Sequence, residues 1–317
     1  MDLLEINNLI LGFNTEKGYF NALNDVSLKV KSGETHALVG ESGCGKSITA
    51  MSILGLIPKT AKITEGEILF KGKNLLGLSK SELIDYRGAH IALIPQDPMT
   101  SLNPLYTVGN QLVEIIELHQ NLYGNDAKKA AIEALENVKI PSAKERFNQY
   151  PYEFSGGMRQ RAIIAMALAC NAELIIADEP TTALDVTIQA QIMQILKEIK
   201  QEKNTAILLI THDLAIVYQN ADEVSVMYAG SIVESAKTDE FFKNTNHPYS
   251  IGLLKSLPEN RNKKLFAIKG HPPMISDNIK GCKFHKRCEF NMPDLCCKKI
   301  PGLRHVGENH SSACFLN

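Results

Sequence analysis

The stretch GESGCGKS, residues Gly40–Ser47, follows the apolar run THALV and leads into SITAMSILGL, which has helical spacing. Glycines in such a turn allow successive backbone N–H groups to point at the β- and γ-phosphates of a nucleotide. Lys46 would pair with the phosphates, and the Ser47 hydroxyl would ligate Mg²⁺. A structural glycine turn is the alternative, but a strand before and a helix after are what a phosphate loop requires. The sequence therefore predicts that the chain binds and hydrolyses ATP.

The composition favours a folded globular protein. Of the 317 residues, 44% are hydrophobic and 22% charged, enough for one large core or one core plus an appendage. The net charge of −1 disfavours nucleic acid as a partner, because binding to a phosphate backbone needs clustered Lys and Arg. The longest uncharged apolar stretch, near residues 162–172, is short of the ~18 to 20 residues that cross a bilayer. The start MDLLEINN has no secretory signal pattern, so we expect the chain to stay in the cytosol.

Hydrophobic periodicity predicts an α/β chain. The pattern of residues 3–39 predicts short β segments. The stretch EGEILFKGKNL predicts a hairpin that turns at Lys71–Lys73. From Ser79 to about Gln160 the spacing becomes helical, interrupted by the turn-rich PQDPMTSLNP, which indicates a helical insertion. The apolar runs LIIA and AILLI then flank the amphipathic segment TIQAQIMQILKEIKQE, and the hairpin pattern EVSVMYAGSIVES follows. Strands that alternate with helices predict a parallel sheet.

The segment LIIADE, residues Leu174–Glu179, places two carboxylates at the end of an apolar strand. Burial of such groups is tolerable only with a cation partner or a catalytic task. Asp178 would hold Mg²⁺ through water, and Glu179 would polarise the attacking water. An acidic N-cap of the next helix is the alternative. With a phosphate loop upstream, we expect the catalytic role.

The segment SGGMRQ, residues Ser155–Gln160, opens the helical stretch RQRAIIAMALA. The backbone N–H groups and the positive dipole end of such a helix form an anion site. A second phosphate site on one chain is redundant unless it serves another chain. A capped helix without a ligand is the alternative for this segment taken alone.

Together, GESGCGKS, SGGMRQ, LIIADEP and the following Ala183-Leu184-Asp185 resemble the nucleotide-binding subunits of ATP-binding-cassette (ABC) transporters, over about residues 4–257. In that family two cassettes face head to tail, and the signature serine of one closes on the γ-phosphate bound by the other. The resemblance implies that role for Ser155, with Gly157 and Gln160 in the same signature. Hydrolysis would therefore require a dimer.

Three further positions match motifs of the family. Gln96, in IPQDP, matches the switch glutamine that senses Mg²⁺ and water, with an ordinary turn residue as the alternative. His212, after AILLIT, matches the histidine that contacts the γ-phosphate, with a structural histidine as the alternative. Asp185 matches the loop acid that communicates across the dimer.

The aromatic residue that stacks on adenine in this family is expected upstream of the phosphate loop, where Phe13, Tyr19 and Phe20 all lie. We favour Tyr19, and each of the three could instead pack against the β-subdomain. Ile48 stands where many cassettes have a hydroxyl residue, but its backbone N–H can still reach the α-phosphate. The loop residues expected to contact the nucleotide are Ser42, Gly43, Cys44, Gly45, Lys46, Ser47 and Ile48.

The stretches QDPMTSLNPLYTVGNQL and HPYSIGLLKSLP are similar to the ATPases of dipeptide and oligopeptide importers, a group that also contains nickel and glutathione importers. In that group PMTSLNP belongs to the helical subdomain that grips a coupling helix of the permease. The resemblance implies that the chain powers peptide import, with nickel, a metallophore or glutathione as alternative cargo. A rival from another class is a soluble ATP-gated switch that acts on the ribosome or nucleic acid. Tandem cassettes or long coiled-coil insertions would favour it, and the sequence contains neither.

Five of the seven cysteines lie after residue 281. The segment GCKFHKRCEFNMPDLCCKKIPGL…HSSAC looks like the C-terminal motif of the peptide importers, which ligates a [4Fe–4S] cluster. Four thiolates can hold such a cluster or tetrahedral Zn²⁺. The resemblance assigns as ligands Cys282, Cys288, Cys296 and Cys314. The gap between the second and third ligands is one residue longer than in the family, Cys297 competes with its neighbour, and cysteines without any ligand are a third alternative.

The resemblance implies an α/β fold of the P-loop NTPase type: a RecA-like core, an antiparallel β-subdomain, a helical subdomain at about 86–160 and a small C-terminal metal-cluster domain. We expect the cassette over 1–257 and the C-terminal domain over 258–317. The implied cofactors are ATP, Mg²⁺ and a [4Fe–4S] cluster, or Zn²⁺ in place of the cluster. The implied partners are a paralogous cassette or a second copy, two permease subunits, and indirectly an extracytoplasmic peptide-binding protein, with no nucleic acid. Such an assembly places the chain peripherally on the cytoplasmic side of the inner membrane.

Overall fold

A computed structural model describes residues 2–16, 18–181, 184–257, 266–274 and 279–316. The chain forms two compact units. Unit 1 comprises Lys31–Glu34 and Leu78–Leu209, and unit 2 comprises Asp2–Val30, Thr35–Gly77 and Ile210–Asn317. The expected domain boundary at 257/258 lies at the start of residues 258–265, which are outside the described residues, so it stays a prediction.

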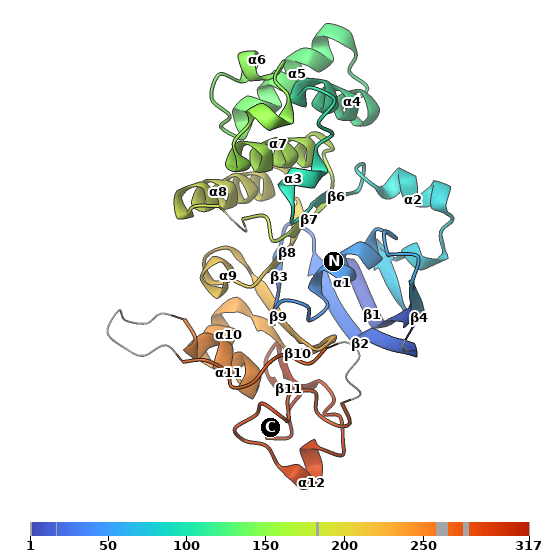
Figure 1. Cartoon of the computed structure of the whole chain (residues 1–317), viewed down its shortest axis with the longest axis vertical. Coiled ribbons are helices and arrows are strands. Elements are labelled where there is room, and N and C mark those ends of the chain that lie inside the picture. The colour runs from blue at the N-terminus through green and yellow to red at the C-terminus, as the bar shows by residue number, and fades with distance from the viewer. Residues whose placement is uncertain (1, 17, 182–183, 258–265, 275–278, 317) are drawn as a thin grey trace. The chain divides into compact units, whose positions relative to one another are not determined.

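Unit 2 begins with an antiparallel sheet in the order β2-β1-β4-β5, whose longer strands are the blue and cyan arrows of Figure 1. Its elements are β1 (Asp2–Thr15), β2 (Gly18–Lys31), β4 (Ala61–Phe70), β5 (Lys73–Asn74) and the 3-10 helix η1 (Leu75–Gly77). β4 pairs with β1 from Leu4↔Phe70 to Phe13↔Ala61. The predicted hairpin with a turn at Lys71–Lys73 is therefore confirmed, as β4 and β5.

A second group of strands in unit 2 has the order β11-β12-β10-β9-β3. These elements are β3 (Thr35–Val39), α1 (Lys46–Ile53), α9 (Leu214–Asn220), β9 (Glu223–Tyr228), β10 (Ser231–Lys237), α10 (Thr238–Lys243), α11 (Pro248–Lys255), α12 (Pro293–Cys296), β11 (Arg304–Gly307) and β12 (His310–Ser312). β3 runs parallel to β9, and all five of its residues are buried, as in parallel sheets covered on both faces. The predicted hairpin EVSVMYAGSIVES is confirmed as β9 and β10.

The C-terminal tail, residues 279–316, is built into unit 2. β12 pairs with β10 at Ser312↔Glu234 and His310↔Ala236. Phe284 is buried in the same core cluster as Val226, Phe241 and Tyr249. The tail therefore shares both a sheet and a hydrophobic core with the cassette residues that precede it.

Unit 1 is mostly helical. Its elements are α2 (Lys80–Tyr86), β6 (Ile91–Ile94), α3 (Pro98–Ser101), α4 (Val108–Gln120), α5 (Gly124–Asn137), α6 (Ala143–Arg146), the 3-10 helix η2 (Pro151–Glu153), α7 (Gly156–Ala169), β7 (Leu174–Asp178), α8 (Val186–Lys203) and most of β8 (Ala206–Thr211). Local caps begin the helices that the periodicity predicts, because the side chains of Ser155, Thr107 and Asp185 accept from backbone N–H groups at the starts of α7, α4 and α8. The helical insertion is confirmed with one correction. β6, a strand parallel to β7, lies inside the stretch predicted as helical.

β6 was not predicted from the sequence, and the reason is physical. Its four residues, IALI, are nearly all buried, so the strand shows no alternation of polar and apolar residues. A short apolar run of this kind cannot be told from part of a buried helix by periodicity. Its pairing with β7 matters for the site, because it brings the segment after Ile94 next to the segment after Ala177.

Candidate functional site

The phosphate loop of unit 2 connects β3 to α1. Gly45 has φ = +114° and directly precedes the helix, and Gly40 has φ = +156°. A Cβ on Gly40 would lie 2.2 Å from the carbonyl oxygen of Met227, so the close backbone approach also requires glycine there. Backbone N–H groups in the first turn of a helix point out of its N-terminal end, where they bind anions. Ser47 and Ile48 occupy that first turn.

Lys46 lies inside this loop. The residue is 5% exposed, and its Nζ donates to the carbonyl oxygens of Gly40 at 2.8 Å and Glu41 at 3.0 Å. Its ammonium is therefore held where the loop closes on itself. Cys44 is also buried, and burial raises the pKa of its thiol although Lys46 opposes the shift. Cys44 is thus a buried thiol that packs within the loop.

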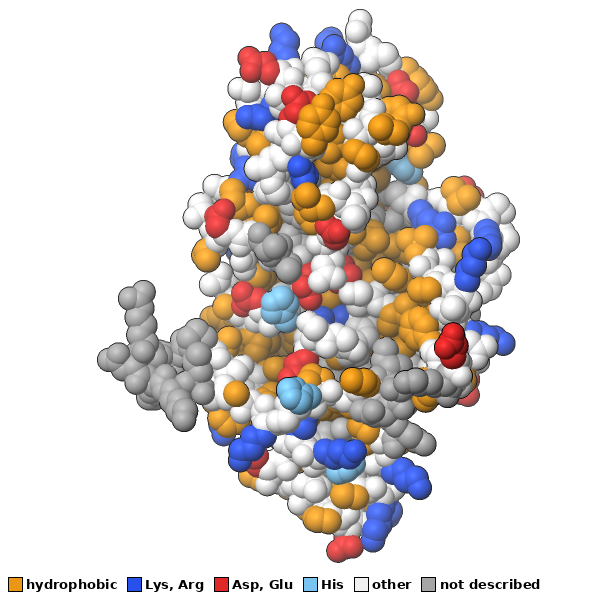
Figure 2. Space-filling view, in the orientation of Figure 1, with side chains coloured by type: hydrophobic (Ala, Val, Ile, Leu, Met, Phe, Trp, Pro, Cys, Tyr) orange, Lys and Arg blue, Asp and Glu red, His pale blue; other side chains and the backbone are white. Residues whose placement is uncertain are grey.

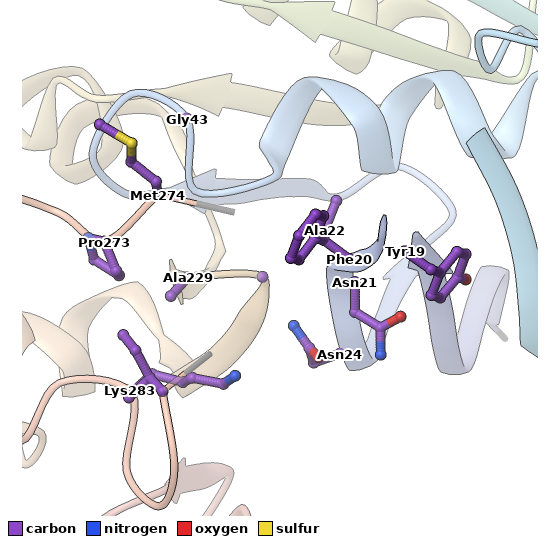
Figure 3. Close-up of a pocket in the computed structure, with 12 residues that line it drawn as sticks. Tyr19, Phe20, Asn21, Ala22, Asn24, Gly43, Ala229, Pro273, Met274 and Lys283 are labelled. Carbon is purple, nitrogen blue, oxygen red and sulfur yellow. The ribbon is translucent and has the colours of Figure 1, made fainter. Parts of the chain in front are cut away.

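A cavity of about 370 Å³ opens beside the loop within unit 2. Tyr19 and Phe20 of β2 line it together with Gly43 of the loop, whereas Phe13 is not among its described lining residues. In Figure 3, Tyr19 and Phe20 lie on one side of the view, and Pro273, Met274 and Lys283 of the C-terminal segment on the other. The volume is in the range of small-molecule sites.

The lining contributed by the C-terminal segment was not predicted. Pro273, Met274 and Ile279 belong to no predicted motif, Lys283 lies in the cysteine motif without an assigned role, and more than two hundred residues separate all four from the loop. No signal in the single sequence could have found them, because their proximity to Gly43 depends on the packing of unit 2. His212, also in unit 2, is exposed between β8 and Asp213, which caps α9.

Unit 1 carries the predicted acidic residues. Asp178 is the last residue of β7 and Glu179 follows it directly, and they are only 6% and 8% exposed. Gln96 follows β6, and its Nε2 donates to Oε2 of Glu179 at 3.0 Å. Parallel pairing of β6 with β7 accounts for this contact, because the carboxyl ends of neighbouring parallel strands meet at one edge. The structure thus brings together two predicted site residues that are 83 positions apart.

Glu179 also has an unusual backbone. Its φ is +46°, in the left-handed region that residues with a side chain rarely occupy. Such strain costs of the order of 1–3 kcal/mol and persists where the surroundings enforce it, often at functional sites. The strained turn and the Gln96 hydrogen bond together fix the Glu179 carboxylate.

The signature segment also lies in unit 1. Ser155 caps α7 by accepting from the N–H of Met158 at 3.3 Å, and Gly157 lies in the first turn. A Cβ on Gly157 would come within 3.3 Å of Ile188, so the glycine keeps α7 close to α8. Gln160 is buried, and Asp185 caps α8 through the N–H of Ile188 at 2.9 Å. Ala183, which the sequence places in the same motif as Asp185, lies outside the described residues.

Four of the five tail cysteines line one small cavity, and these are Cys282, Cys288, Cys296 and Cys314. Its other walls include Phe284, Met292 and Phe315, and Cys297 is not among the lining residues. Burial raises the pKa of Cys282 to about 11 and also raises that of Cys288 and Cys314. However, no three His, Cys, Asp or Glu side chains of the described residues are arranged to hold a metal ion. The structure therefore does not support the expected metal-cluster domain, and the cluster remains a proposal.

No helix among the described residues combines the length and the apolar character that crossing a bilayer requires.

Two parts of the chain match known protein families. Residues 23–182 match the ABC transporter family, and residues 233–296 match the C-terminal region of oligopeptide/dipeptide transporters. The second match covers three of the four cysteines of the cavity.

Curated relatives match nearly the whole chain. A probable peptide ABC transporter ATP-binding protein, y4tR of Sinorhizobium fredii, is 48% identical over 99% of this chain and 94% of its own length. The dipeptide transport ATP-binding protein DppD of Bacillus subtilis is 47% identical over the same shares. The oligopeptide transport ATP-binding protein OppD of Salmonella typhimurium is 46% identical over 99% of this chain and 93% of its own length.

Solved structures agree with these relatives. The dimeric post-hydrolysis structure of the ATP-binding cassette MJ0796 with ADP and Pi has a TM-score of 0.68 and 29% identity, covering 74% of this chain and 98% of that one. The structure of cbiO1 from Clostridium perfringens, part of an ABC transporter complex, has a TM-score of 0.65 and 27% identity, covering 80% and 95%. With its phosphate loop, acidic strand end and signature helix, the chain belongs to the ABC transporter family of ATP-binding proteins and carries the C-terminal region of its oligopeptide/dipeptide transporters.

Proposed function

We propose that the chain is the ATP-hydrolysing subunit that powers the import of dipeptides or oligopeptides through a membrane ABC transporter. The observation that carries the hydrolytic role is the contact between Gln96 and Glu179 at the end of the buried strand β7. The peptide class rests on similarity that extends through the tail. Relatives named for dipeptide and oligopeptide transport are 45–49% identical over 99% of the chain.

Each predicted site residue has a task that its chemistry fits. Lys46 and the start of α1 neutralise the β- and γ-phosphates, and His212 contacts the γ-phosphate. Glu179 accepts a proton from the attacking water while Gln96 holds its carboxylate in place. Tyr19 and Phe20 line the cavity in which the base would lie, and Tyr19 is the proposed stacking partner.

The donors assigned to Mg²⁺ are the Ser47 hydroxyl, the Gln96 amide oxygen and the Asp178 carboxylate. All three are oxygen ligands, which Mg²⁺ prefers. The bound ion would neutralise charge that develops on the phosphates. Asp178 is 6% exposed at the end of β7.

The signature residues Ser155, Gly157 and Gln160 are proposed to complete the site of a second cassette, with Asp185 at the dimer contact. The dimeric form of the related cassette MJ0796 supports this arrangement. The second cassette is either a paralogue or another copy of this chain. Because each site would take residues from two chains, ATP hydrolysis by the isolated chain should be weak.

Permease subunits are the expected membrane partners, and unit 1 offers them an apolar surface. Large hydrophobic side chains with at least half of their surface exposed lie around α3 and η2, namely Met99, Leu105, Tyr106 and Tyr152. Figure 2 shows a further group of hydrophobic side chains near the top of the view, in the region of α4 and α5. We place the chain peripherally on the cytoplasmic side of the membrane, with a peptide-binding protein on the other side.

The four cysteines of the tail cavity are proposed to hold a [4Fe–4S] cluster, in a C-terminal domain that begins near residue 258. Four thiols line this cavity together with apolar side chains and with His247 and His285, and four thiolates are the ligands of an iron–sulfur cluster. Tetrahedral Zn²⁺ on the same four thiolates is the alternative. Cys296 is preferred over Cys297 because it lines the cavity.

Reconstitution tests the proposal. The chain, its partner cassette and two permease subunits of the same organism would be placed in liposomes, and uptake of labelled dipeptides, oligopeptides, Ni²⁺ and glutathione would be measured with and without ATP. Peptide uptake that requires ATP is the expected result. Uptake of Ni²⁺ or glutathione without uptake of peptides would mean that the cargo differs from the proposed one, while the role as transporter ATPase would stand. A stable complex with RNA or DNA and none with a permease would favour the soluble switch and contradict the proposal.

A further inference from the structure

An arginine of the tail holds the phosphate loop. Within unit 2, the guanidinium of Arg287 donates to both carboxylate oxygens of Glu41, Nη1 to Oε2 at 2.6 Å and Nη2 to Oε1 at 2.9 Å. The side chain of Arg287 is 6% exposed and that of Glu41 is 25% exposed. A bidentate pair between a fixed guanidinium and a carboxylate restrains both orientation and distance.

Arg287 is itself held by its surroundings. Its Nε donates to the carbonyl oxygen of Lys269 at 3.0 Å, and Nη1 also reaches the hydroxyl of Tyr228 at 3.4 Å. The guanidinium lies 5.8 Å from the ring centroid of Tyr228 and 5.9 Å from that of Phe284. Hydrogen bonding to Glu41 raises the pKa of Arg287 above its usual range, so the residue stays charged. Its position is therefore set by the tail and by the core under it.

Glu41 is the second residue of the phosphate loop, and three of its groups are restrained. Its N–H donates to the hydroxyl of Tyr249 at 2.9 Å, and its carbonyl oxygen accepts from Lys46 Nζ at 3.0 Å. Its carboxylate accepts from Arg287. A shift of Glu41 would move one of the two carbonyl groups that position the Lys46 ammonium.

The two residues that bind Glu41, Tyr249 and Arg287, both lie against the ring of Phe284. The ring of Phe284 packs edge-on against Tyr228 at 5.2 Å and lies 5.4 Å from Tyr249. Phe284 and Arg287 both lie between Cys282 and Cys288 in sequence. The segment of the tail that carries the first two cysteines therefore also supplies the contacts that restrain the loop.

We propose that Arg287 is a positioning residue for ATP binding: by fixing Glu41 it holds the phosphate loop, so the tail forms part of the ATP site of its own chain. This inference rests on the proposed function in that the loop binds ATP. The lining of the adjacent cavity supports it independently, because Lys283 and Ile279 of the tail and Gly43 of the loop face the same space.

The test compares Mg–ATP binding, measured by calorimetry, for the parent, Arg287→Ala, Arg287→Lys, Glu41→Ala and the Arg287→Ala/Glu41→Ala double variant. Each alanine variant should raise the Kd for ATP about tenfold, since small displacements of a positioning group have large effects. The double variant should be no weaker than either single one, because one interaction is lost in all three. Arg287→Lys keeps the positive charge but cannot form the bidentate pair with Glu41, so its Kd for ATP should lie between those of the parent and Arg287→Ala. In the assembled transporter, KM for ATP should rise while kcat at saturating ATP changes less than about twofold.

Glu289→Gln is the matched control, because Glu289 pairs with Lys269 in the same tail but both side chains are more than half exposed. It should bind ATP like the parent. Circular dichroism and the thermal unfolding midpoint identify any variant that fails to fold, in which case the comparison of Arg287→Lys with Glu289→Gln decides. Parent-like ATP affinity in a folded Arg287→Ala, or additive effects in the double variant, would overturn the inference. A parent protein that does not bind ATP would instead refute the proposed function.

Discussion

Oε1 of Glu234 lies 2.8 Å from Nε2 of His310, and both residues are at most 1% exposed. The same carboxylate accepts from the backbone N–H groups of Asn246 at 2.7 Å and His247 at 3.0 Å. It thus joins β10, the start of α11 and the tail strand β12. A buried carboxylate on β10 whose partners come from two other segments holds the tail to the cassette part of unit 2.

Replacement of His310 by alanine should therefore destabilise unit 2. The change removes one partner of a buried polar pair and leaves Glu234 under-satisfied, which typically costs about 3 kcal/mol. Urea unfolding followed by fluorescence or circular dichroism measures the loss, and limited proteolysis should show earlier cleavage in the tail.

His305→Ala is the control for this change. His305 belongs to the same β11–β12 hairpin, but it is exposed, and its Nδ1 lies 3.2 Å from the hydroxyl of Ser311, which is itself on the surface side of the hairpin pair. Its effect should stay within about 0.5 kcal/mol. Equal unfolding free energies for the two variants would contradict the anchoring role of His310.

Glu179→Gln should abolish turnover and preserve ATP binding. The carboxylate that Gln96 orients is lost as a base, and removal of a general base lowers kcat by about 100-fold or more. Phosphate release by the assembled transporter gives kcat, and calorimetry gives the Kd for Mg–ATP.

The pair Gln194–Glu198 on α8 provides a control of the same chemistry. Gln194 Nε2 donates to Glu198 Oε1 at 2.9 Å in an exposed position. Glu198→Gln should leave kcat unchanged. A Glu179→Gln transporter that hydrolyses ATP at the parent rate would remove Glu179 from the mechanism.

The motifs could be predicted from sequence because each depends on local chemistry. GESGCGKS needs glycines within eight residues, and Ser155 and Asp185 are caps of the helices they precede. Gln96 and Glu179 could be named separately, but their contact depends on β6 pairing with β7, and β6 itself has no recognisable period.

Contacts between the loop and the tail could not be predicted. Glu41 and Arg287 are 246 positions apart, and no motif in the sequence links them. Their pairing follows from the packing of Phe284 against Tyr228 and Tyr249, which a single sequence does not encode as a motif. The choice between Cys296 and Cys297 likewise depends on which side chain turns into the cavity.

That choice gives a third prediction. Cys296→Ser should lose most of the iron of a chain purified without oxygen, whereas Cys297→Ser should retain it, because only Cys296 lines the cavity with the other three cysteines. Iron and acid-labile sulfide per chain, with the visible absorbance of the cluster, measure the outcome. The reverse result would assign Cys297 as the ligand. If the parent protein contained one zinc ion per chain and no iron, the site would be a zinc site and the cluster assignment would be wrong.

His247 predicts how the stability of unit 2 depends on pH. The residue is 2% exposed, and burial lowers the pKa of its imidazole to about 4. Its Nδ1 accepts from the N–H of Tyr249 at 3.1 Å as the N-cap of α11, which requires that nitrogen to be unprotonated. The unfolded chain, with a pKa near its usual value of about 6.5, takes up a proton first as the pH falls. The stability is therefore fully present above about pH 6.5 and is lost as the pH falls towards 4.

The expected loss from this residue between pH 7.5 and pH 5 is about 2 kcal/mol. His247→Asn keeps a capping side chain without a group that titrates in this range, so its unfolding free energy should fall by about that much less than the parent's. Contributions from other groups, including Glu234 beside the His247 backbone, are common to both proteins and cancel in the difference. His271→Asn, at an exposed position of the same unit, should follow the parent at both pH values. If His247→Asn lost as much stability as the parent, a buried neutral His247 would not account for the acid sensitivity.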